Sequence, residues 1–275
     1  MNIPNAAALL HERYGIDPFK PDRLWNETLM TLLSHRSVRA YRPDSLPSQT
    51  LEALVAAAQS AATSSNLQTW SVVAIEDPVR KETLAQLAGN QAHIRQCPLF
   101  LVWLADLARL HQLALQRGLP ADGLDYLEMF LTATIDATLA AQNATSAAES
   151  LGLGTVYIGG IRNQPEGVAA TLQLPPHLVA VFGLCVGYPD ESKPAAIKPR
   201  LPQTAVLHRE TYDLAPQAGA IAQYNAVMQQ FYAAQHMSVA DDWVEHSLKR
   251  VATAQALGGR DRLKESLQRL GFPLL

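Results

Sequence analysis

Cysteine is scarce in this sequence, which argues against disulfide-stabilised folds and cysteine-rich metal sites. Only two of the 275 residues are cysteines. Cys97 and Cys185 lie in the apolar runs QCPLFLVW and VFGLCVGY, away from the spacings of metal-ligating cysteines. We therefore expect two buried free thiols and no metal site. The first residues, MNIPNAAALLHERYG, do not resemble a signal peptide, so we expect a cytoplasmic protein.

The sequence also has no large excess of positive or negative charge and no long apolar run. Charged side chains make up 17% of the chain, and the net charge of −3 gives a pI near 6.2. A general nucleic-acid binder usually has a basic face, so we expect no nucleic-acid partner. The longest apolar region, residues 124–151, is interrupted by polar residues such as Asp125 and Asp136. Because a bilayer span needs about 18 uninterrupted apolar residues, we also expect no membrane association.

The chain contains enough hydrophobic residues to form a sizeable core, since they make up 48% of it and the mean hydropathy is −0.02. Residues 1–30 are predicted as a helical N-terminal extension, and residues 31–275 as a single domain with a C-terminal helical excursion. Helices and strands are mixed without strict alternation, which favours the α+β class. Strands are predicted at 70–75, 98–105, 155–160 and 178–189, and helices at 51–62, 79–88, 122–151, 165–172, 216–235, 241–257 and 260–270.

The long predicted helix over 122–151 is the most informative element. One of its faces repeats large apolar side chains every three or four residues, the helical period. Its opposite surface is rich in Ala and Thr and can also pack closely. Two packable faces indicate a central helix, with one face available to a second subunit. The apolar repeat consists of Leu124, Leu127, Leu131, Ile135 and Leu139.

Two basic clusters have no obvious structural task. His35, Arg36 and Arg39 lie close together around Ser37, and Lys198 and Arg200 flank a proline in a late loop. A phosphate monoester carries close to two negative charges, so it prefers Arg, Lys and hydroxyl donors. One interpretation of the two clusters is therefore that they bind a phosphate group. The alternative is a solvated helix cap.

Two further segments could line a ligand. Residues 63–70, TSSNLQTW, form a small polar loop between a predicted helix and a strand. Its donors and acceptors suit a ligand edge, although an ordinary turn with capping hydroxyls has the same composition. In Tyr157-Ile158-Gly159-Gly160, paired glycines follow a strand, and their missing Cβ atoms would let a planar ligand lie against the backbone.

Together these segments closely resemble the flavin reductase and oxygen-insensitive nitroreductase family, in its major, NADPH-linked group A branch. The matching segments occur in the family's order and span about residues 30–270. They are HRSVR (35–39), TSSNLQTW (63–70), GNQAHI (89–94), ESLGLGTVYIGGIRN (149–163), FGLCVGYP (182–189) and KPRLP (198–202). The resemblance implies a nitroreductase-type fold, with a central mixed β-sheet flanked by helices, assembled as an intertwined homodimer.

The resemblance also implies an FMN cofactor held by residues of these motifs. The phosphate group would be bound by His35, Ser37, Lys198 and Arg200 of the first and last motifs, and Arg36 would also belong to the cofactor-binding residues. Arg39 would lie near the pyrimidine side of the flavin, where a cation stabilises charge at N1 of the reduced ring. Gln91 would hydrogen-bond the ring, and Tyr157, Ile158, Gly159 and Gly160 would line it. Thr63, Ser64 and Asn66 would come from the partner subunit.

The activity implied by the resemblance is that of an FMN-dependent oxidoreductase. NADPH or NADH passes hydride to flavin N5 and leaves, and a nitroaromatic, quinone or free flavin then takes its place, which gives ping-pong kinetics. Because the cofactor carries the chemistry, we assign no catalytic residue, and His93 and Cys97 are interpreted as structural. The alternative is a flavin-binding or flavin-consuming protein on the same fold, with altered or lost nicotinamide use.

The sequence departs from the group A pattern in one region. Members of that group bind the 2′-phosphate of NADPH with basic residues of the C-terminal excursion. The corresponding segment here, FYAAQHMSVADDW over 231–243, contains no Arg or Lys. An Arg–phosphate contact is a strong charge-assisted interaction, so its loss bears directly on the choice between NADPH and NADH.

Overall fold

The computed structural model describes residues 6–16, 18–19, 25–239 and 241–275. They form two compact units, one from residues 1–36 and 195–257 and the other from residues 37–194 and 258–275. We call them the helical unit and the sheet unit. The helical extension predicted for residues 1–30 contains α1 (Ala6–Tyr14) and the start of α2 (Glu27–Leu33). Its residues 1–5, 17 and 20–24 lie outside the described residues. The single domain expected over 31–275 remains a prediction.

The sheet unit is built on four strands whose mutual pairings are antiparallel, in the order β1-β2-β4-β3. All residues of β2 are buried, as the uninterrupted apolar run PLFLVWLA predicts for a central strand. An isolated parallel bridge joins Ser37, which lies outside these strands, to Thr155. The predicted central sheet flanked by helices is confirmed. The strands are β1 (Trp70–Ile75), β2 (Leu99–Asp106), β3 (Gly154–Ile158) and β4 (Leu178–Gly187).

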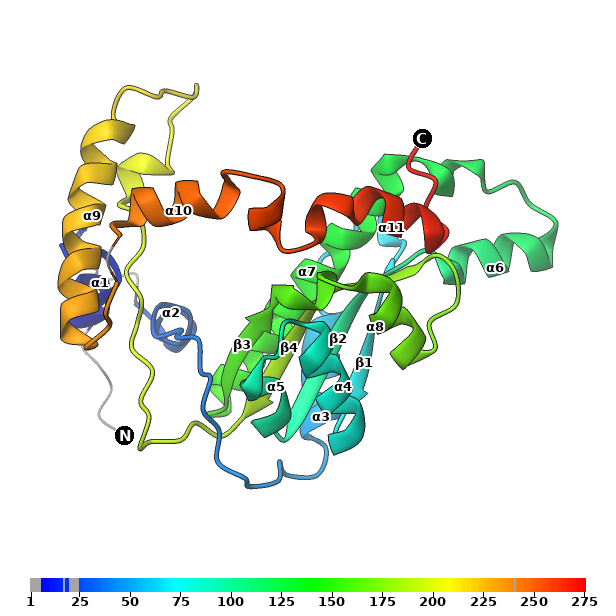
Figure 1. Cartoon of the computed structure of the whole chain (residues 1–275), viewed down its shortest axis with the longest axis horizontal. Coiled ribbons are helices and arrows are strands. Elements are labelled where there is room, and N and C mark those ends of the chain that lie inside the picture. Colours follow the sequence, from blue (N-terminus) through cyan, green and yellow to red (C-terminus); the bar gives the residue numbers. More distant parts are fainter. Residues whose placement is uncertain (1–5, 17, 20–24, 240) are drawn as a thin grey trace. The chain divides into compact units, whose positions relative to one another are not determined.

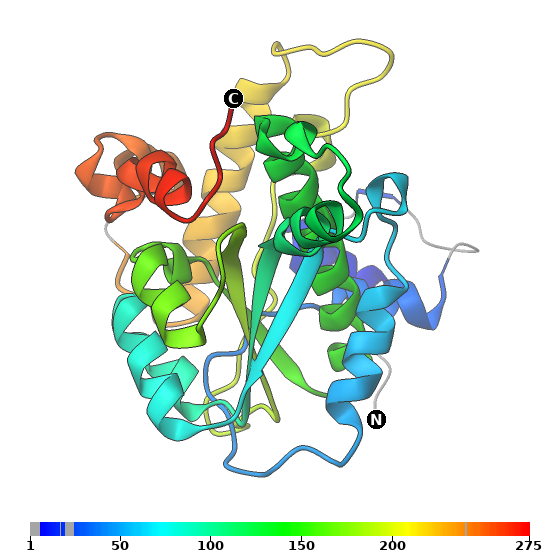
Figure 2. The ribbon, with the colours of Figure 1, turned by 90° about the vertical axis from the view of Figure 1, so that its right-hand side faces the viewer.

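Helices cover both faces of this sheet (Figure 2). On one face, α3 (Thr50–Gln59) and α7 (Leu127–Ser150) enclose a core around Trp103, Leu101 and Leu184. The other face carries α4 (Pro78–Leu87), α5 (Ala92–Gln96) and α8 (Pro165–Leu172). The unit also contains α6 (Ala108–Arg117) and α11 (Leu263–Arg269). Cys97 and Cys185 are buried and free, which confirms the two predicted thiols.

The predicted long helix is present as α7, preceded by a 3₁₀ turn over Asp122–Asp125. Its alanine face, which includes Ala133, Ala137, Ala140 and Ala144, is fully buried because small side chains let the helix approach the sheet closely. Its large apolar face is only partly covered by the described residues. Leu127, Leu131, Ile135 and Leu139 are 46%, 46%, 57% and 42% exposed, respectively.

The helical unit consists of α1, α2, α9 (Gln217–Ala234) and α10 (Trp243–Val251), with the loop that follows residue 195 (Figure 1). Side chains cap two of these helices. Asn26 accepts a hydrogen bond from the Leu29 amide at the start of α2, and Asp242 accepts one from the Glu245 amide at the start of α10. None of the helices that the structure describes is long and apolar enough to cross a bilayer.

Candidate functional site

In the helical unit, one buried arginine connects both predicted phosphate-binding segments. Arg13 lies near the end of α1 and is 6% exposed. Its guanidinium donates hydrogen bonds to the carbonyls of Leu33 at 2.8 Å, His35 at 2.6 Å and Lys198 at 2.9 Å. The Arg200 amide donates to the Arg13 carbonyl at 2.8 Å. Arg13 therefore fixes the start of the HRSVR motif against the backbone of the KPR segment.

The KPR segment combines a fixed backbone with exposed cationic side chains. Pro199 is buried, and the Tyr224 hydroxyl donates to its carbonyl at 3.1 Å. Burial raises the pKa of Tyr224, so this donor keeps its proton. Lys198 and Arg200 are exposed, and the Lys198 ammonium lies 5.9 Å from the ring centre of Tyr232. Cations on a fixed backbone suit an anionic ligand.

In the sheet unit, the second half of HRSVR runs beside β3. Ser37 bridges to Thr155, and the Val38 amide donates to the Thr155 carbonyl at 2.8 Å. Arg39 is exposed and lies close to His93 in α5. Burial first, and then the charge of Arg39, lower the pKa of His93. The structure thus places Arg39 beside the helix that begins immediately after Gln91.

Gln91 and Gly160 converge on one carbonyl group at the end of α4. The Gln91 side-chain amide donates to the Ala88 carbonyl at 3.4 Å. A Cβ atom on Gly160 would lie 2.4 Å from the same oxygen, so only glycine lets the two backbones approach. Gly159, by comparison, has room for a Cβ, which would be in ordinary van der Waals contact with the side chains of Arg162 and Arg260 at 3.6 and 3.8 Å.

The two guanidinium groups beside Gly159 were not assigned from the sequence. Arg162 donates a hydrogen bond to the Val181 carbonyl, and burial and the nearby charge of Arg260 lower its pKa. Both arginines lie in the sheet unit although they are far apart in the chain. Arg162 belongs to the quoted YIGGIRN motif, whereas nothing in the sequence around Arg260 indicates this neighbourhood. Together they give this side of Gly159 a positive field.

Tyr157 and Ile158 point to opposite faces of the sheet, as neighbouring residues of a strand do. The Thr145 hydroxyl of α7 donates to the Tyr157 hydroxyl at 2.9 Å, and the Tyr157 ring packs edge-on against Phe182. Burial raises the pKa of Tyr157 to about 12. Ile158 is buried on the other face. Of the two side chains, Ile158 is therefore the one on the face of α4 and α5.

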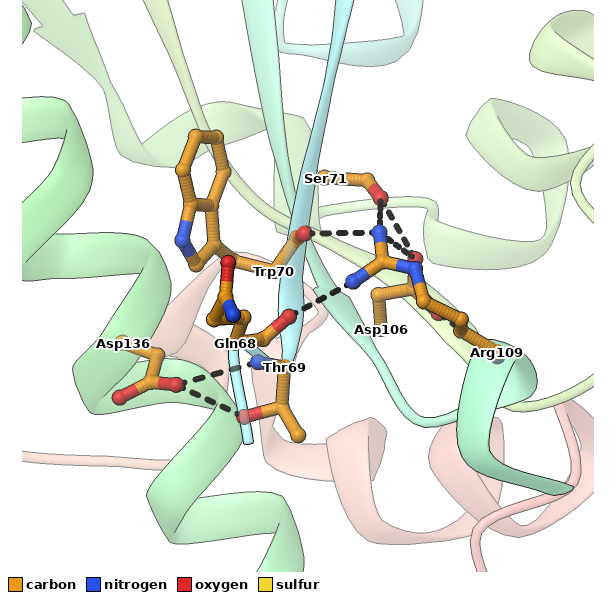
Figure 3. A network of polar contacts seen from close by, with 7 residues as sticks. All are labelled: Gln68, Thr69, Trp70, Ser71, Asp106, Arg109 and Asp136. Atoms are coloured by element: carbon orange, nitrogen blue, oxygen red, sulfur yellow. Dashed lines mark hydrogen bonds and ion pairs between the residues drawn. The ribbon is translucent and has the colours of Figure 1, made fainter. Parts of the chain in front are cut away.

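The polar loop over residues 63–69 is anchored to α7 by Asp136. This carboxylate is 2% exposed and accepts hydrogen bonds from both the backbone and the hydroxyl groups of the loop (Figure 3). Thr63 is half-buried, and Ser64 and Asn66 are exposed. The loop is thus tied to the helix that covers the sheet face opposite α4 and α5, the helices on either side of Gln91.

Asp136 was predicted only as an interruption of an apolar run. No sequence signal identifies its role, because its hydrogen-bond donors lie 67 to 73 residues earlier in the chain. Arg13 was missed for a similar reason. Its carbonyl partners are 20, 22 and 185 residues away.

Two family models match almost the whole chain. The model of the nitroreductase family matches residues 32–188, and that of the nitroreductase family C-terminal domain matches residues 198–275. The first match alone covers the four strands and most of the predicted site, and the second begins at Lys198.

Individual relatives agree with these matches. The FMN reductase (NADPH) of Bacillus subtilis is 45% identical over 190 residues, which are 69% of this chain and 76% of the relative. The oxygen-insensitive NADPH nitroreductase of Salmonella typhimurium is 37% identical over 220 residues, 80% of this chain and 88% of the relative. The solved structure of the NADPH:FMN oxidoreductase of Vibrio harveyi complexed with NAD+ superposes with a TM-score of 0.79 at 32% identity, covering 90% of this chain and 99% of that one. This chain belongs to the nitroreductase family.

Proposed function

We propose that this protein is an FMN-dependent oxidoreductase that uses NADPH or NADH to reduce nitroaromatics, quinones or flavins by a ping-pong mechanism. The relatives named above are FMN reductases and nitroreductases, and the predicted cofactor motifs occur in this chain in the family's order. The observation that carries the proposal is the pairing of the HRSVR and KPR segments through buried Arg13.

The residues present fit FMN in both charge and space. The phosphate group needs cations and hydroxyl donors, which the two segments joined by Arg13 provide. A planar ring needs backbone without side-chain bulk, which Gly159 provides; the nearest atoms to its Cβ position belong to the side chains of Arg162 and Arg260, at 3.6 and 3.8 Å. Bound FMN supplies the redox chemistry, because its ring accepts hydride from the nicotinamide and delivers it to the acceptor.

We assign the phosphate to the basic residues and the serine of the two segments, His35, Arg36, Ser37, Lys198 and Arg200. The backbone around Lys198 is held by hydrogen bonds from Arg13 and Tyr224, so it loses little further entropy when an anion binds.

We assign the ring to residues of the sheet unit. Arg39 supplies a positive charge to the pyrimidine side, where the reduced ring is anionic. The Gln91 side chain offers an amide donor and an acceptor for the ring edge. Gly159 supplies backbone without a side chain, Gly160 lets that backbone pack against the Ala88 carbonyl, and Ile158 and Tyr157 support it from the two faces of β3.

We further propose that the protein works as a homodimer, with Thr63, Ser64 and Asn66 reaching the cofactor of the partner. The exposed apolar face of α7 supports this assembly, since four large side chains repeat along it at intervals of four residues. In a monomer this stripe would stay in contact with water.

Both nicotinamides are proposed to serve as electron donors. The segment 231–243 has no Arg or Lys, and its two aspartates already have structural partners. Asp241 pairs with Lys249 at 2.5 Å, and Asp242 caps α10. Lys249 is thereby engaged, and the region offers little to distinguish the 2′-phosphate of NADPH from the hydroxyl of NADH.

An FMN titration of the purified apoprotein tests the proposal. We expect one FMN per chain, a size of two chains in solution, and NADPH and NADH oxidation that depends on added FMN and an acceptor. A protein that binds no FMN would contradict the whole proposal. A protein that binds FMN but oxidises neither nicotinamide would support the alternative of a flavin-binding protein.

A further inference from the structure

We propose that Asp136 is a positioning residue, which holds the loop over residues 63–69 in the conformation that presents Thr63, Ser64 and Asn66 to FMN. This inference rests on the proposed function. In this proposal a buried carboxylate that does not itself contact FMN determines the shape of that part of the cofactor site.

The Asp136 carboxylate accepts hydrogen bonds from several groups of this loop. Its Oδ2 accepts from the Thr63 hydroxyl at 2.5 Å and from the Thr69 amide and hydroxyl, each at 3.1 Å. Its Oδ1 accepts from the Ser64 amide at 3.1 Å. No described Lys, Arg or His forms an ion pair with it. A charge that is 2% exposed is therefore stabilised almost wholly by donors of this loop.

The chemistry of these donors requires a carboxylate at this position. An ionised Asp presents only acceptors, and all four donors point at it. An Asn of the same shape would turn an NH2 group toward at least one of them. The buried anion thus specifies one loop conformation, which an uncharged amide of equal size cannot do.

The loop itself would not adopt this shape without help. Ser65, Asn66 and Gln68 have φ of 48°, 56° and 52°, in the left-handed region that non-glycine residues rarely occupy. Conformations of this kind persist where the surrounding structure over-determines them, and they gather at functional sites. The tip of the loop is exposed, so its conformation does not serve core packing.

A second anchor acts on the far end of the loop. The Arg109 guanidinium of α6 donates to the Gln68 carbonyl at 2.7 Å and the Ser71 hydroxyl at 2.9 Å, and it pairs with Asp106 at 3.2 Å. Figure 3 shows Asp136 and Arg109 holding the chain from opposite sides just before β1. Pinned ends and an exposed polar tip are what a ligand-presenting loop requires.

The position of the anchor agrees with the proposed assembly. Asp136 directly follows Ile135, one of the exposed apolar residues of α7. Asp136 itself points to the buried side of α7, with Ala133 and Ala137, because successive residues of a helix point about 100° apart. The loop is therefore anchored on the side of α7 next to the face that we assign to the dimer contact.

The test compares FMN binding by the full-length dimer and its Asp136→Asn variant, which keeps the side-chain volume. We expect the FMN dissociation constant to rise about tenfold or more. In the FMN-free protein, we expect the Ser64 and Thr69 amides to lose protection from hydrogen exchange while the amides of β2 keep theirs. A loss of general stability alone would not produce this local pattern.

Lys81→Met is the matched control. Lys81 is also charged and 6% exposed in the sheet unit, but its ammonium donates to the Cys97 carbonyl and contacts no residue of the loop. Equal weakening of FMN binding in both variants would overturn the inference, because general destabilisation would then explain it. A dissociation constant of Asp136→Asn within about twofold of the wild type would overturn it as well.

A second variant covers the case in which Asp136→Asn does not fold. Arg109→Met removes the second anchor of the loop. The Arg109 side chain is 47% exposed, so its loss should disturb folding less than a change at Asp136. We expect FMN binding about threefold weaker or more, and an unchanged value would contradict the inference. If the wild type itself binds no FMN, it is the proposed function that fails.

Discussion

Removal of the Arg13 guanidinium is the perturbation whose effect the structure defines best. In Arg13→Met the carbonyls of Leu33, His35 and Lys198 lose their donors, while the volume of the side chain stays similar. A hydrogen bond from a charged donor contributes about 1.5–3 kcal/mol. These acceptors are only partly buried, so water recovers part of each loss.

If each carbonyl costs about 1 kcal/mol, the free energy of unfolding falls by about 3 kcal/mol in total. This is a large share of the unfolding free energy of a typical domain, which is about 5–15 kcal/mol. The protein should still fold, but the HRSVR and KPR segments would no longer be held together. We expect FMN binding to weaken about tenfold or more. Arg13→Lys should lie between the wild type and Arg13→Met, because one ammonium cannot reproduce the fork of a guanidinium.

Urea unfolding followed by circular dichroism measures the first effect, and FMN fluorescence titration measures the second. Arg209→Met is the control, because the side chain of Arg209 is exposed in the same unit. If Arg13→Met kept both the wild-type unfolding midpoint and the wild-type FMN affinity, the assignment of Arg13 as the connection between the two segments would be refuted.

Three further outcomes follow from single contacts. Gly160→Ala should lower the free energy of unfolding by about 1–3 kcal/mol, because its Cβ would lie 2.4 Å from the Ala88 oxygen, whereas Gly159→Ala should leave thermal stability unchanged and weaken FMN binding. Burial and a nearby arginine lower the pKa of His93, so the unfolded chain binds the proton more readily, and stability should fall as the pH drops below about 6.5. His93→Gln should flatten that part of the curve of unfolding free energy against pH, and an unchanged slope would argue against it. Ile135→Arg places a charge on the exposed face of α7 and should give a monomer in sedimentation analysis, with FMN lost in parallel; a stable dimer would exclude this face as the contact.

The sheet and most helices could be predicted because their residues carry the pattern locally. The run WSVVAI predicts β1 over the same residues that the structure shows, and the run PLFLVWLA predicts β2 to within one residue. The helical period of the large apolar residues and the Ala and Thr content of the other side also identified α7 and its two faces. These signals need no knowledge of distant residues.

The C-terminal region was predicted less well. A helix was expected over 241–257, but α10 ends at Val251. Residues 252–259 instead contain a short 3₁₀ helix over Gln255–Leu257, followed by Gly258 and Gly259 with φ of 64° and 86°. Helix α6 was not predicted at all. Short helices with mixed polar and apolar residues leave a weak periodic signal, so tertiary contacts decide where they end.

The candidate site shows where sequence reasoning stops. The basic motifs were visible because a phosphate needs cations, and such clusters stand out in an acidic chain. The residues that hold those motifs in place were not visible. Asp136 and Arg13 act on backbone groups far away in the chain, and only the fold reveals which groups those are.

The central claim is tested most directly by anaerobic mixing of the FMN-loaded protein with NADPH and, separately, with NADH. The account predicts that the visible absorbance of the bound flavin is lost with both donors at one equivalent per site, and that it returns when a quinone or nitroaromatic is added after the oxidised nicotinamide has been removed. A flavin that stays oxidised with both donors would contradict the account.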